Sequence, residues 1–247
     1  MNPIIDALRK NWARYVLEAM VITFSIIGAF MLDNWKEEKQ HRKEEQVILL
    51  GLKDEFLENL HDVDRNIKLN EGVINATYEL INLIRIENWF EDQDRIDSLI
   101  ASIYMFGTFD AHTGVTDELI SGGKLSLIKD EKLKKHLTGW SGMLKDSQED
   151  YEIRIQLYSF ILIPEFLNHF TLANGDMYLD FSNWSDNYKV GSREKSPLKQ
   201  NVSDLNLLRF ENILWVHKMN NDFVTLNEQN LKEYIETTIE LIESNIN

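Results

Sequence analysis

Residues 15–32 read YVLEAMVITFSIIGAFML and form the only strongly apolar run in this chain of 247 residues. A helix rises ~1.5 Å per residue, so the run extends ~27 Å, close to the ~30 Å hydrocarbon core of a bilayer. Trp12 and Trp35 flank the run, and amphipathic aromatic rings prefer the membrane interface. The sequence therefore predicts one transmembrane helix over residues 15–33, after a basic N-terminal tail at residues 1–14.

The predicted span contains one ionisable residue, Glu18, in its first turn. Three interpretations are open: a cleaved signal peptide, a carboxyl group that reaches the headgroups, and a carboxyl group that faces a partner helix or a wet lumen. Cleavage is the least favoured, because Gly28-Ala29-Phe30-Met31 lacks the A-x-A pattern. A carboxyl group near a helix end snorkels readily, whereas a charge at the membrane centre costs about 2.5 to 3.5 kcal/mol.

One face of the predicted span combines Glu18 with small and polar residues. Small residues let two helices approach closely in lipid, so this face predicts self-association within the membrane. The candidate residues of this transmembrane interface are Glu18, Ile22, Ser25, Gly28, Ala29 and Leu32.

The cations beside the span leave its orientation nearly balanced. Three precede it and four follow it: Arg9, Lys10 and Arg14, then Lys36, Lys39, Arg42 and Lys43. Long domains translocate largely regardless of charge, whereas a short tail with three cations is poorly exported. We therefore expect a cytoplasmic N-terminus and a periplasmic body by a narrow margin, and a cytoplasmic body remains the alternative.

Charge separates the membrane-proximal residues from the rest of the chain. Of the 26 basic and 41 acidic residues, 7 and 5 lie in residues 1–43, which leaves residues 44–247 with a net charge of −17. Such an acidic body is repelled by phosphate backbones, so nucleic acid is not an expected partner. The absence of cysteine excludes disulfides, thiolate metal sites and cysteine nucleophiles.

A long helix is expected directly after the span. Residues 36–46 read KEEKQHRKEEQ, typical of a solvated helical stalk, and no proline occurs between residues 34 and 86. An apolar stripe then follows helical spacing, interrupted only by Asn70 and Thr77. It comprises Leu49, Leu52, Phe56, Leu60, Val63, Ile67, Ile74, Ile81 and Ile84. Residues 34–86 therefore predict a stalk and amphipathic helix of ~50 residues, packed on later helices of its own chain or on a second chain.

The remaining sequence predicts shorter helices and one irregular region. In residues 87–170 we expect helices at 92–104, 116–120, 130–144 and 150–170, with a stop at residues 121–123 and a kink or break at Pro164. Residues 171–203 are rich in Gly, Asn, Asp and Ser and predict an irregular loop region, and residues 204–247 predict two helices, at 204–219 and 225–246. The fold class is all-α: one N-terminal transmembrane helix continuing into a long amphipathic helix packed with a helical bundle.

No catalytic motif appears in the chain. Phosphate-binding, dinucleotide-binding, zinc-protease and nucleophile-elbow patterns are all missing from the sequence. The best polar cluster is Asp110, His112 and Glu118, in and after a turn-prone stretch. Capping of the helix expected near Thr116 explains the same residues. We therefore expect no enzyme activity, no metal and no cofactor.

The order of motifs is similar to that of a known family. Asp33-Asn34-Trp35 ends the span, residues 52–60 read LKDEFLENL, and residues 117–130 read DELISGGKLSLIKD. Together they resemble an uncharacterised bacterial family of single-pass membrane proteins with an E-L-x-S-x-G-x-L-x-L-I segment. The resemblance covers most of residues 10–170, although Met20 and Phe24 depart from the usual aliphatic span. It implies a location in the bacterial inner membrane and no particular activity.

These features predict a membrane-anchored helical interaction or sensory module that self-associates. Its expected partners are the lipid bilayer, further copies of the chain and a protein bound to the soluble part. An alternative is a small oligomeric ion- or proton-conducting protein that uses Glu18. A third hypothesis is an enzyme with a polar site near Asp110 and His112.

Overall fold

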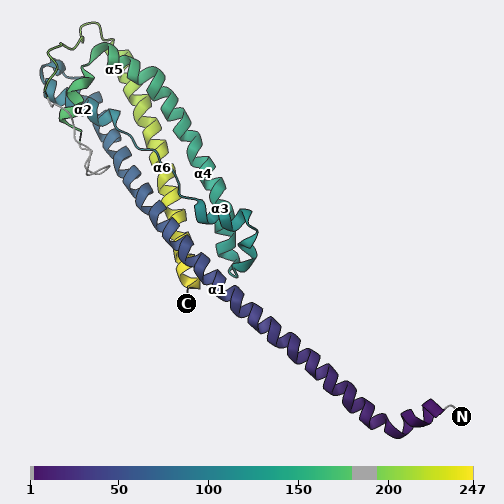
Figure 1. Cartoon of the computed structure of the whole chain (residues 1–247). Coiled ribbons are helices and arrows are strands. Elements are labelled where there is room, and N and C mark those ends of the chain that lie inside the picture. The colour runs from purple at the N-terminus through teal and green to yellow at the C-terminus, as the bar shows by residue number, and fades with distance from the viewer. Residues whose placement is uncertain (1–2, 180–193, 247) are drawn as a thin grey trace.

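The protein, a computed structural model that describes residues 3–179 and 194–246, is an elongated helical bundle with one helix extending far beyond it (Figure 1). That helix, α1 (Pro3–Leu83), is 81 residues long. The described residues form helices and no strand. The predicted all-α fold, with a long N-terminal helix packed against later helices, is confirmed.

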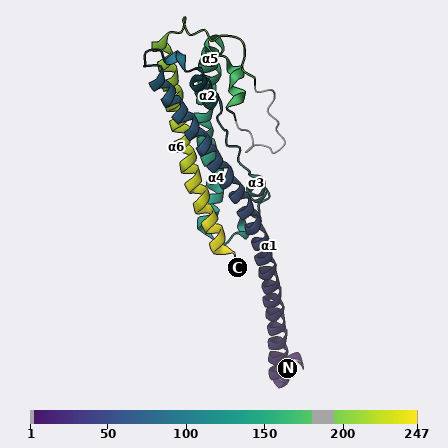
Figure 2. The ribbon, with the colours of Figure 1, turned by 90° about the vertical axis from the view of Figure 1, so that its left-hand side faces the viewer.

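Three long helices lie side by side in the bundle: α1, α4 (Glu131–Leu157) and α6 (Leu207–Asn245) (Figures 1 and 2). The short helix α3 lies at the end next to the stalk, and α2 and α5 lie at the far end. The remaining elements, in chain order, are η1 (Trp89–Glu91), α2 (Gln93–Tyr104), α3 (Gly114–Ser121), η2 (Lys124–Leu127), the π-helical η3 (Tyr158–Leu162), α5 (Ile163–His169) and η4 (Leu172–Met177).

α1 changes its environment at Glu45. Residues 12–44 are all exposed, and Glu45 is the first buried residue after them. Beyond it, apolar side chains at helical spacing, such as Leu49, Leu52 and Phe56, are fully buried. Burial on one face therefore holds this part of α1 in the bundle, while residues 33–44 form a bare stalk.

Several helix ends are set by capping residues or glycines that can be recognised in the sequence. Asp92 accepts a hydrogen bond from the backbone of Arg95 at 3.1 Å, and Asp130 accepts one from Leu133 at 2.7 Å. Both carboxylates thereby cap the helices that follow them, α2 and α4. The predicted stop at residues 121–123 is confirmed, because Gly123 adopts a left-handed conformation with φ 68°.

Two predicted helix breaks are wrong. α4 continues through residues 145–149, and α6 continues through residues 220–224. Polar residues suggested loops there, but neither stretch contains proline or glycine, and burial of Ser147 and Asn221 holds both stretches in the bundle. We expected a kink or break at Pro164, and the helix type changes just before it: α4 passes into the π-helical η3, which leads directly into α5 with Pro164 in its first turn.

The predicted loop region and terminal tail differ in part from expectation. The part of residues 171–203 that the structure describes contains η4 followed by irregular chain at residues 194–203, and residues 180–193 lie outside the described part. α1 begins at Pro3, so residues 3–14 of the basic tail are helical and continuous with the apolar run.

The bundle contains two apolar clusters rather than one continuous core. The stalk-side cluster packs the segment of α1 around Phe56 against α4 and the second half of α6. The far-end cluster packs Leu80 and Ile81 of α1 against α2, α5 and the first half of α6. A layer of buried polar side chains lies between them.

Candidate functional site

Six buried polar side chains make up this polar layer, each at most 7% exposed. They come from all three long helices: Asn66 and Asn70 of α1, Tyr151 and Arg154 of α4, and Asn221 and Glu228 of α6. Buried polar groups are costly unless they are hydrogen-bonded, so such a layer favours one specific register of the three helices.

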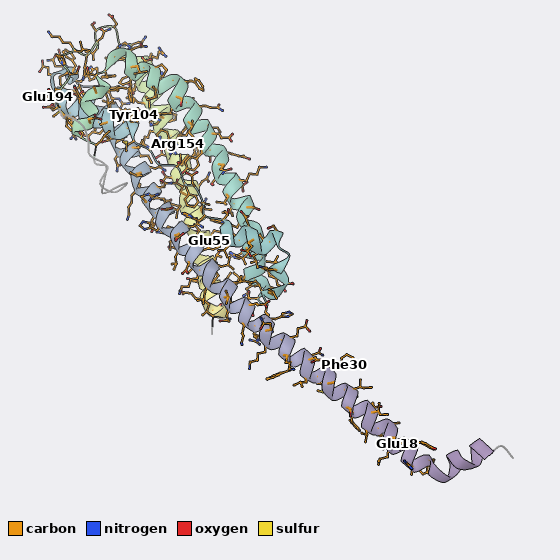
Figure 3. All side chains as sticks on the ribbon, in the orientation of Figure 1. Glu18, Phe30, Glu55, Tyr104, Arg154 and Glu194 are labelled. Atoms are coloured by element: carbon orange, nitrogen blue, oxygen red, sulfur yellow. The ribbon has the colours of Figure 1, made fainter. Side chains whose placement is uncertain are left out.

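Arg154 lies at the centre of the polar layer and is completely buried (Figure 3). Its Nη1 donates to Asn70 Oδ1 at 2.9 Å and to Asn221 Oδ1 at 3.2 Å. Its Nη2 donates to the carbonyl oxygen of Gly107 at 2.7 Å. The guanidinium also lies 4.6 Å from the ring centroids of Phe106 and Tyr151, a cation–π arrangement.

Glu228 supplies the negative charge of the polar layer. One carboxylate oxygen accepts a hydrogen bond from Asn70 Nδ2 at 2.9 Å, and the other accepts one from the Tyr151 hydroxyl. The Tyr151 oxygen in turn accepts from the backbone amide of Phe109 at 2.9 Å. Asn70 therefore bridges Arg154 and Glu228, and the segment after α2 is attached to the same network.

Burial sets the electrostatics of this network. Desolvation raises the pKa of Glu228, and the hydrogen bond from Tyr151 opposes that rise. Desolvation likewise lowers the pKa of Arg154, while the neighbouring Tyr151 and Glu228 oppose the change. Removal of either charged side chain would leave the other buried and uncompensated.

His217, in the first half of α6, extends the network toward the far end of the bundle. Burial lowers its pKa to about 4, so the imidazole is neutral at pH 7. Asn221 presents Oδ1 to Arg154, so its Nδ2 faces the His217 ring and lies 3.3 Å from Nε2. Nε2 is therefore the acceptor, and the ring proton resides on Nδ1.

Two donors in the polar layer have no hydrogen-bond partner among the described residues: Arg154 Nε and Asn66 Nδ2. The position of Asn66 also explains why residue 107 is a glycine: a Cβ on Gly107 would collide with Asn66 Oδ1. The layer is thus tightly packed against the segment after α2.

Two acidic residues of α1 hold the stalk-side end of the bundle. Glu55 accepts hydrogen bonds from the backbone amides of Val115 and Thr116, at 2.5 and 3.2 Å, and from the Thr116 hydroxyl at 2.5 Å. Glu45 accepts one from the backbone of Lys129 at 2.8 Å. The N-terminus of α3 is therefore capped by a side chain about 60 residues earlier in the sequence.

The predicted polar cluster does not converge. His112 faces α1, with Nε2 3.2 Å from Asp62 Oδ2, whereas Glu118 pairs with Lys124 at 2.8 Å. Asp110 accepts a long hydrogen bond, 3.5 Å, from the Thr108 hydroxyl. Within residues 3–179 and 194–246, no three His, Asp or Glu side chains are arranged to hold a metal ion.

The predicted transmembrane interface lies on the bare part of α1, far from the polar layer (Figure 3). All six of its candidate residues, Glu18, Ile22, Ser25, Gly28, Ala29 and Leu32, are exposed. Glu18 accepts a hydrogen bond from Arg14 Nε at 3.0 Å, and the Ser25 hydroxyl donates to the carbonyl of Val21 at 2.7 Å. Both polar groups thus find partners within their own helix.

Sequence reasoning missed the polar layer, although it noted one sign of it. Asn70 and Thr77 interrupt the apolar stripe, and both are fully buried on the same face of α1. The sequence offered no signal that Arg154 and Glu228, from helices much later in the chain, would meet Asn70.

The fold and the bare apolar segment define a class: an all-helical protein with one helix long and apolar enough to cross a membrane. The chain belongs to the family described as "Family of unknown function (DUF6090)", whose family model matches residues 18–141. The match includes the residues from Glu18 to the first part of α4. No curated protein and no solved structure matches the chain.

Proposed function

We propose that this protein is a single-pass, membrane-anchored helical module of the bacterial inner membrane that acts through protein contacts, as an interaction or sensory protein, and self-associates. The observation that carries the proposal is α1, which joins an exposed apolar segment to a buried stripe within one helix. We infer a periplasmic body by a narrow margin, because a short tail with three cations is poorly exported, whereas long domains translocate largely regardless of charge.

The surface of the apolar segment supports membrane insertion. Large apolar side chains such as Leu17, Ile22 and Phe30 are about half or more exposed, and their spacing directs them to three different sides of the helix. A helix that is apolar all round requires burial, and no described part of the chain covers this one. A bilayer supplies that burial.

The continuity of α1 supports a mechanical link between membrane and bundle. The stalk at residues 33–44 has no helix break, and its end is fixed to the bundle by the Glu45 contact and by an ion pair between Lys129 and Glu38 at 3.3 Å. A movement of the span would therefore reach the polar layer through one rigid element, as a sensory module requires.

The local pairing of Glu18 favours the interaction module over the ion-conducting alternative. Its carboxylate is already bonded to Arg14 one turn earlier, toward the expected headgroup region. A pore-lining role instead needs several copies of Glu18 directed at water.

The test is extraction of isolated membranes with alkaline carbonate, which releases peripheral proteins and retains integral ones. We expect the full chain to stay in the membrane and a variant lacking residues 15–32 to be released. A matched control deletes part of the irregular region, residues 194–199, and should stay in the membrane. Release of the intact, folded chain would overturn the proposal.

A further inference from the structure

A buried carboxylate outside the polar layer, that of Asp97 in α2, lies at the end of the bundle away from the stalk (Figure 1). Asp97 is 4% exposed, and among the described residues it forms no ion pair, because the nearby Lys195 pairs instead with Asp94. Burial raises the pKa of the Asp97 carboxyl group, and the hydrogen bond from Asn174 opposes that rise. A carboxylate buried without a countercharge is costly, and such groups are concentrated at functional sites.

Two segments from later in the chain surround this carboxylate. Asn174 of η4 donates from Nδ2 to Asp97 Oδ2 at 2.7 Å, and Gln200 donates from Nε2 to Asp97 Oδ1 at 2.6 Å. Asn174 Oδ1 in turn accepts a hydrogen bond from the backbone amide of Ser196 at 2.8 Å, which ties η4 to the irregular chain at residues 194–203. Each carboxylate oxygen has one donor here and can accept two, so Asp97 has room for a further donor.

Gln200 adds an acceptor that has no donor. Its Oε1 is buried and has no hydrogen-bond partner among the described residues. A buried acceptor without a donor is unfavourable, and a group that arrives with donors removes the penalty. The uncompensated charge of Asp97 and the unpaired oxygen of Gln200 lie at the same place, and an ammonium group would satisfy both.

A cavity of about 500 Å³ lies beside these groups, between α2 and residues 194–203. Asp97, Asn174 and Gln200 line it, together with two lysines. Lys195 is engaged by Asp94, whereas Lys199 is exposed and forms no ion pair within the described part of the chain. The apolar part of the wall is formed by Phe90, Pro197, Leu198 and Val202. The volume is within the range of small-molecule sites.

The charges of the wall restrict the ligand. A purely cationic ligand would suit Asp97 but would meet Lys195 and Lys199 in the same wall. A purely anionic ligand would suit Lys199 but would meet the uncompensated carboxylate. A zwitterion satisfies both, since its ammonium and carboxylate groups can face opposite charges of the wall. The apolar residues of the wall leave space for an apolar side chain.

We propose that this far-end cavity binds a free amino acid with an apolar side chain, whose ammonium group faces Asp97 and Gln200 and whose carboxylate faces Lys199. The inference deepens the proposed function, because it names the chemical class of the stimulus for a sensory module. A bound amino acid would hold η4 and residues 194–203 against α2. α2 packs on α1 in the far-end cluster, so occupancy of the cavity reaches the helix that carries the proposed span.

The first test uses the unaltered full chain in mild detergent. Titration calorimetry is carried out separately with L-leucine, L-isoleucine, L-valine, L-methionine and L-phenylalanine, and at least one should bind saturably with a dissociation constant of about 1 mM or lower. The best of the five is then compared with the amine that lacks its carboxylate and the acid that lacks its ammonium group. Each should bind at least about tenfold more weakly, because each loses one charge-assisted contact.

Two results of this titration would overturn the proposal. If none of the five amino acids binds, the cavity is not an amino-acid site. If the amine or the acid binds as tightly as the amino acid itself, the cavity takes a simple cation or a simple anion.

The second test replaces the residues of the site. Lys199 is exposed, so Lys199→Gln should leave the unfolding temperature of the free protein unchanged and weaken amino-acid binding by about tenfold, without changing the weaker binding of the amine. Lys132→Gln, at an exposed lysine in the first turn of α4, is the matched control and should bind like the wild type. Asp97→Asn, with unchanged helical circular dichroism, should also lose at least about tenfold in affinity. Wild-type affinity in Lys199→Gln would contradict the assigned contacts.

The outcomes separate this inference from the proposed function. If alkaline carbonate leaves the chain in the membrane but no amino acid binds, the inference is wrong and the anchor stands. If carbonate releases the chain and an amino acid still binds with the expected dependence on Lys199, the anchor is wrong and the amino-acid site stands.

Discussion

At the residue scale, the polar layer determines how the three long helices align. Arg154, Asn70 and Glu228 form a chain of hydrogen bonds that only one register of α1, α4 and α6 satisfies. An apolar core alone tolerates many packings, whereas buried polar groups penalise those that leave a donor or acceptor unpaired. Substitutions in this layer should therefore lower the free energy of unfolding by more than the change in side-chain volume alone would suggest.

Gly107→Ala tests the packing of the layer. The new Cβ would collide with Asn66 Oδ1, and Asn66 is buried, so we expect a loss of about 1–3 kcal/mol in the free energy of unfolding. The control is Gly142→Ala in α4, where a Cβ meets open space and should stabilise the helix by up to about 1 kcal/mol. Thermal unfolding of the full chain in detergent compares the two, and equal behaviour would contradict the packing described here.

His217 should give a measurable pH dependence. Burial lowers its pKa from 6.5 to about 4, so the unfolded chain binds more protons between these two values. The free energy of unfolding therefore rises with pH through that window, by roughly 3 kcal/mol from this residue. The raised pKa of Glu228 acts in the opposite direction.

Urea unfolding of the wild type and of His217→Gln at several pH values isolates the contribution of His217. The difference between the two should grow as pH rises from 4 to 6.5. If the free energy of unfolding of the wild type instead changes with pH in parallel with that of His217→Gln, burial does not hold the His217 imidazole neutral.

At the scale of elements, local chemistry in the sequence predicts helix ends better than helix continuity. Asp92, Asp130 and Gly123 mark boundaries because each acts on its own neighbours. The continuity of α4 and α6 depends on burial of Ser147 and Asn221 against other helices, which no local pattern encodes. The polar layer could not be predicted from the sequence for the same reason, since its residues come from three distant parts of the chain.

Glu55 tests how α1 positions α3. Glu55→Ala removes the acceptor for the amides of Val115 and Thr116, so α3 should open locally at a cost of about 1–3 kcal/mol. Hydrogen exchange of these two amides should accelerate, while exchange within α6 stays the same. Glu71→Ala, at an exposed site on α1, is the control, and an equal effect from it would remove the capping role.

At the scale of the whole molecule, α1 connects two environments. Residues 15–32 are exposed and apolar, the part of α1 from residue 45 onward carries the buried face of the bundle, and a stalk of 12 residues, 33–44, separates them (Figures 1 and 3). Residues 15–32 predict a single span, and the structure has one helix there that is long and apolar enough to cross a membrane.

Glu18→Gln distinguishes an anchoring span from a conducting one. If the carboxylate only pairs with Arg14 near the headgroups, the amide should leave insertion, oligomer size and proton flux in liposomes unchanged. A sharp fall in flux with an intact oligomer would instead support the ion-conducting alternative and overturn the interaction module.

The central claim is that the apolar part of α1 crosses a bilayer while the bundle stays in water. Single cysteines at Phe24 and Leu50, both exposed in the isolated chain, measure this directly by labelling with a membrane-impermeant maleimide. In intact membranes, Phe24→Cys should resist labelling until detergent is added, and Leu50→Cys should react readily once the reagent reaches the side of the body. Equal and rapid labelling of both cysteines before detergent would contradict the claim.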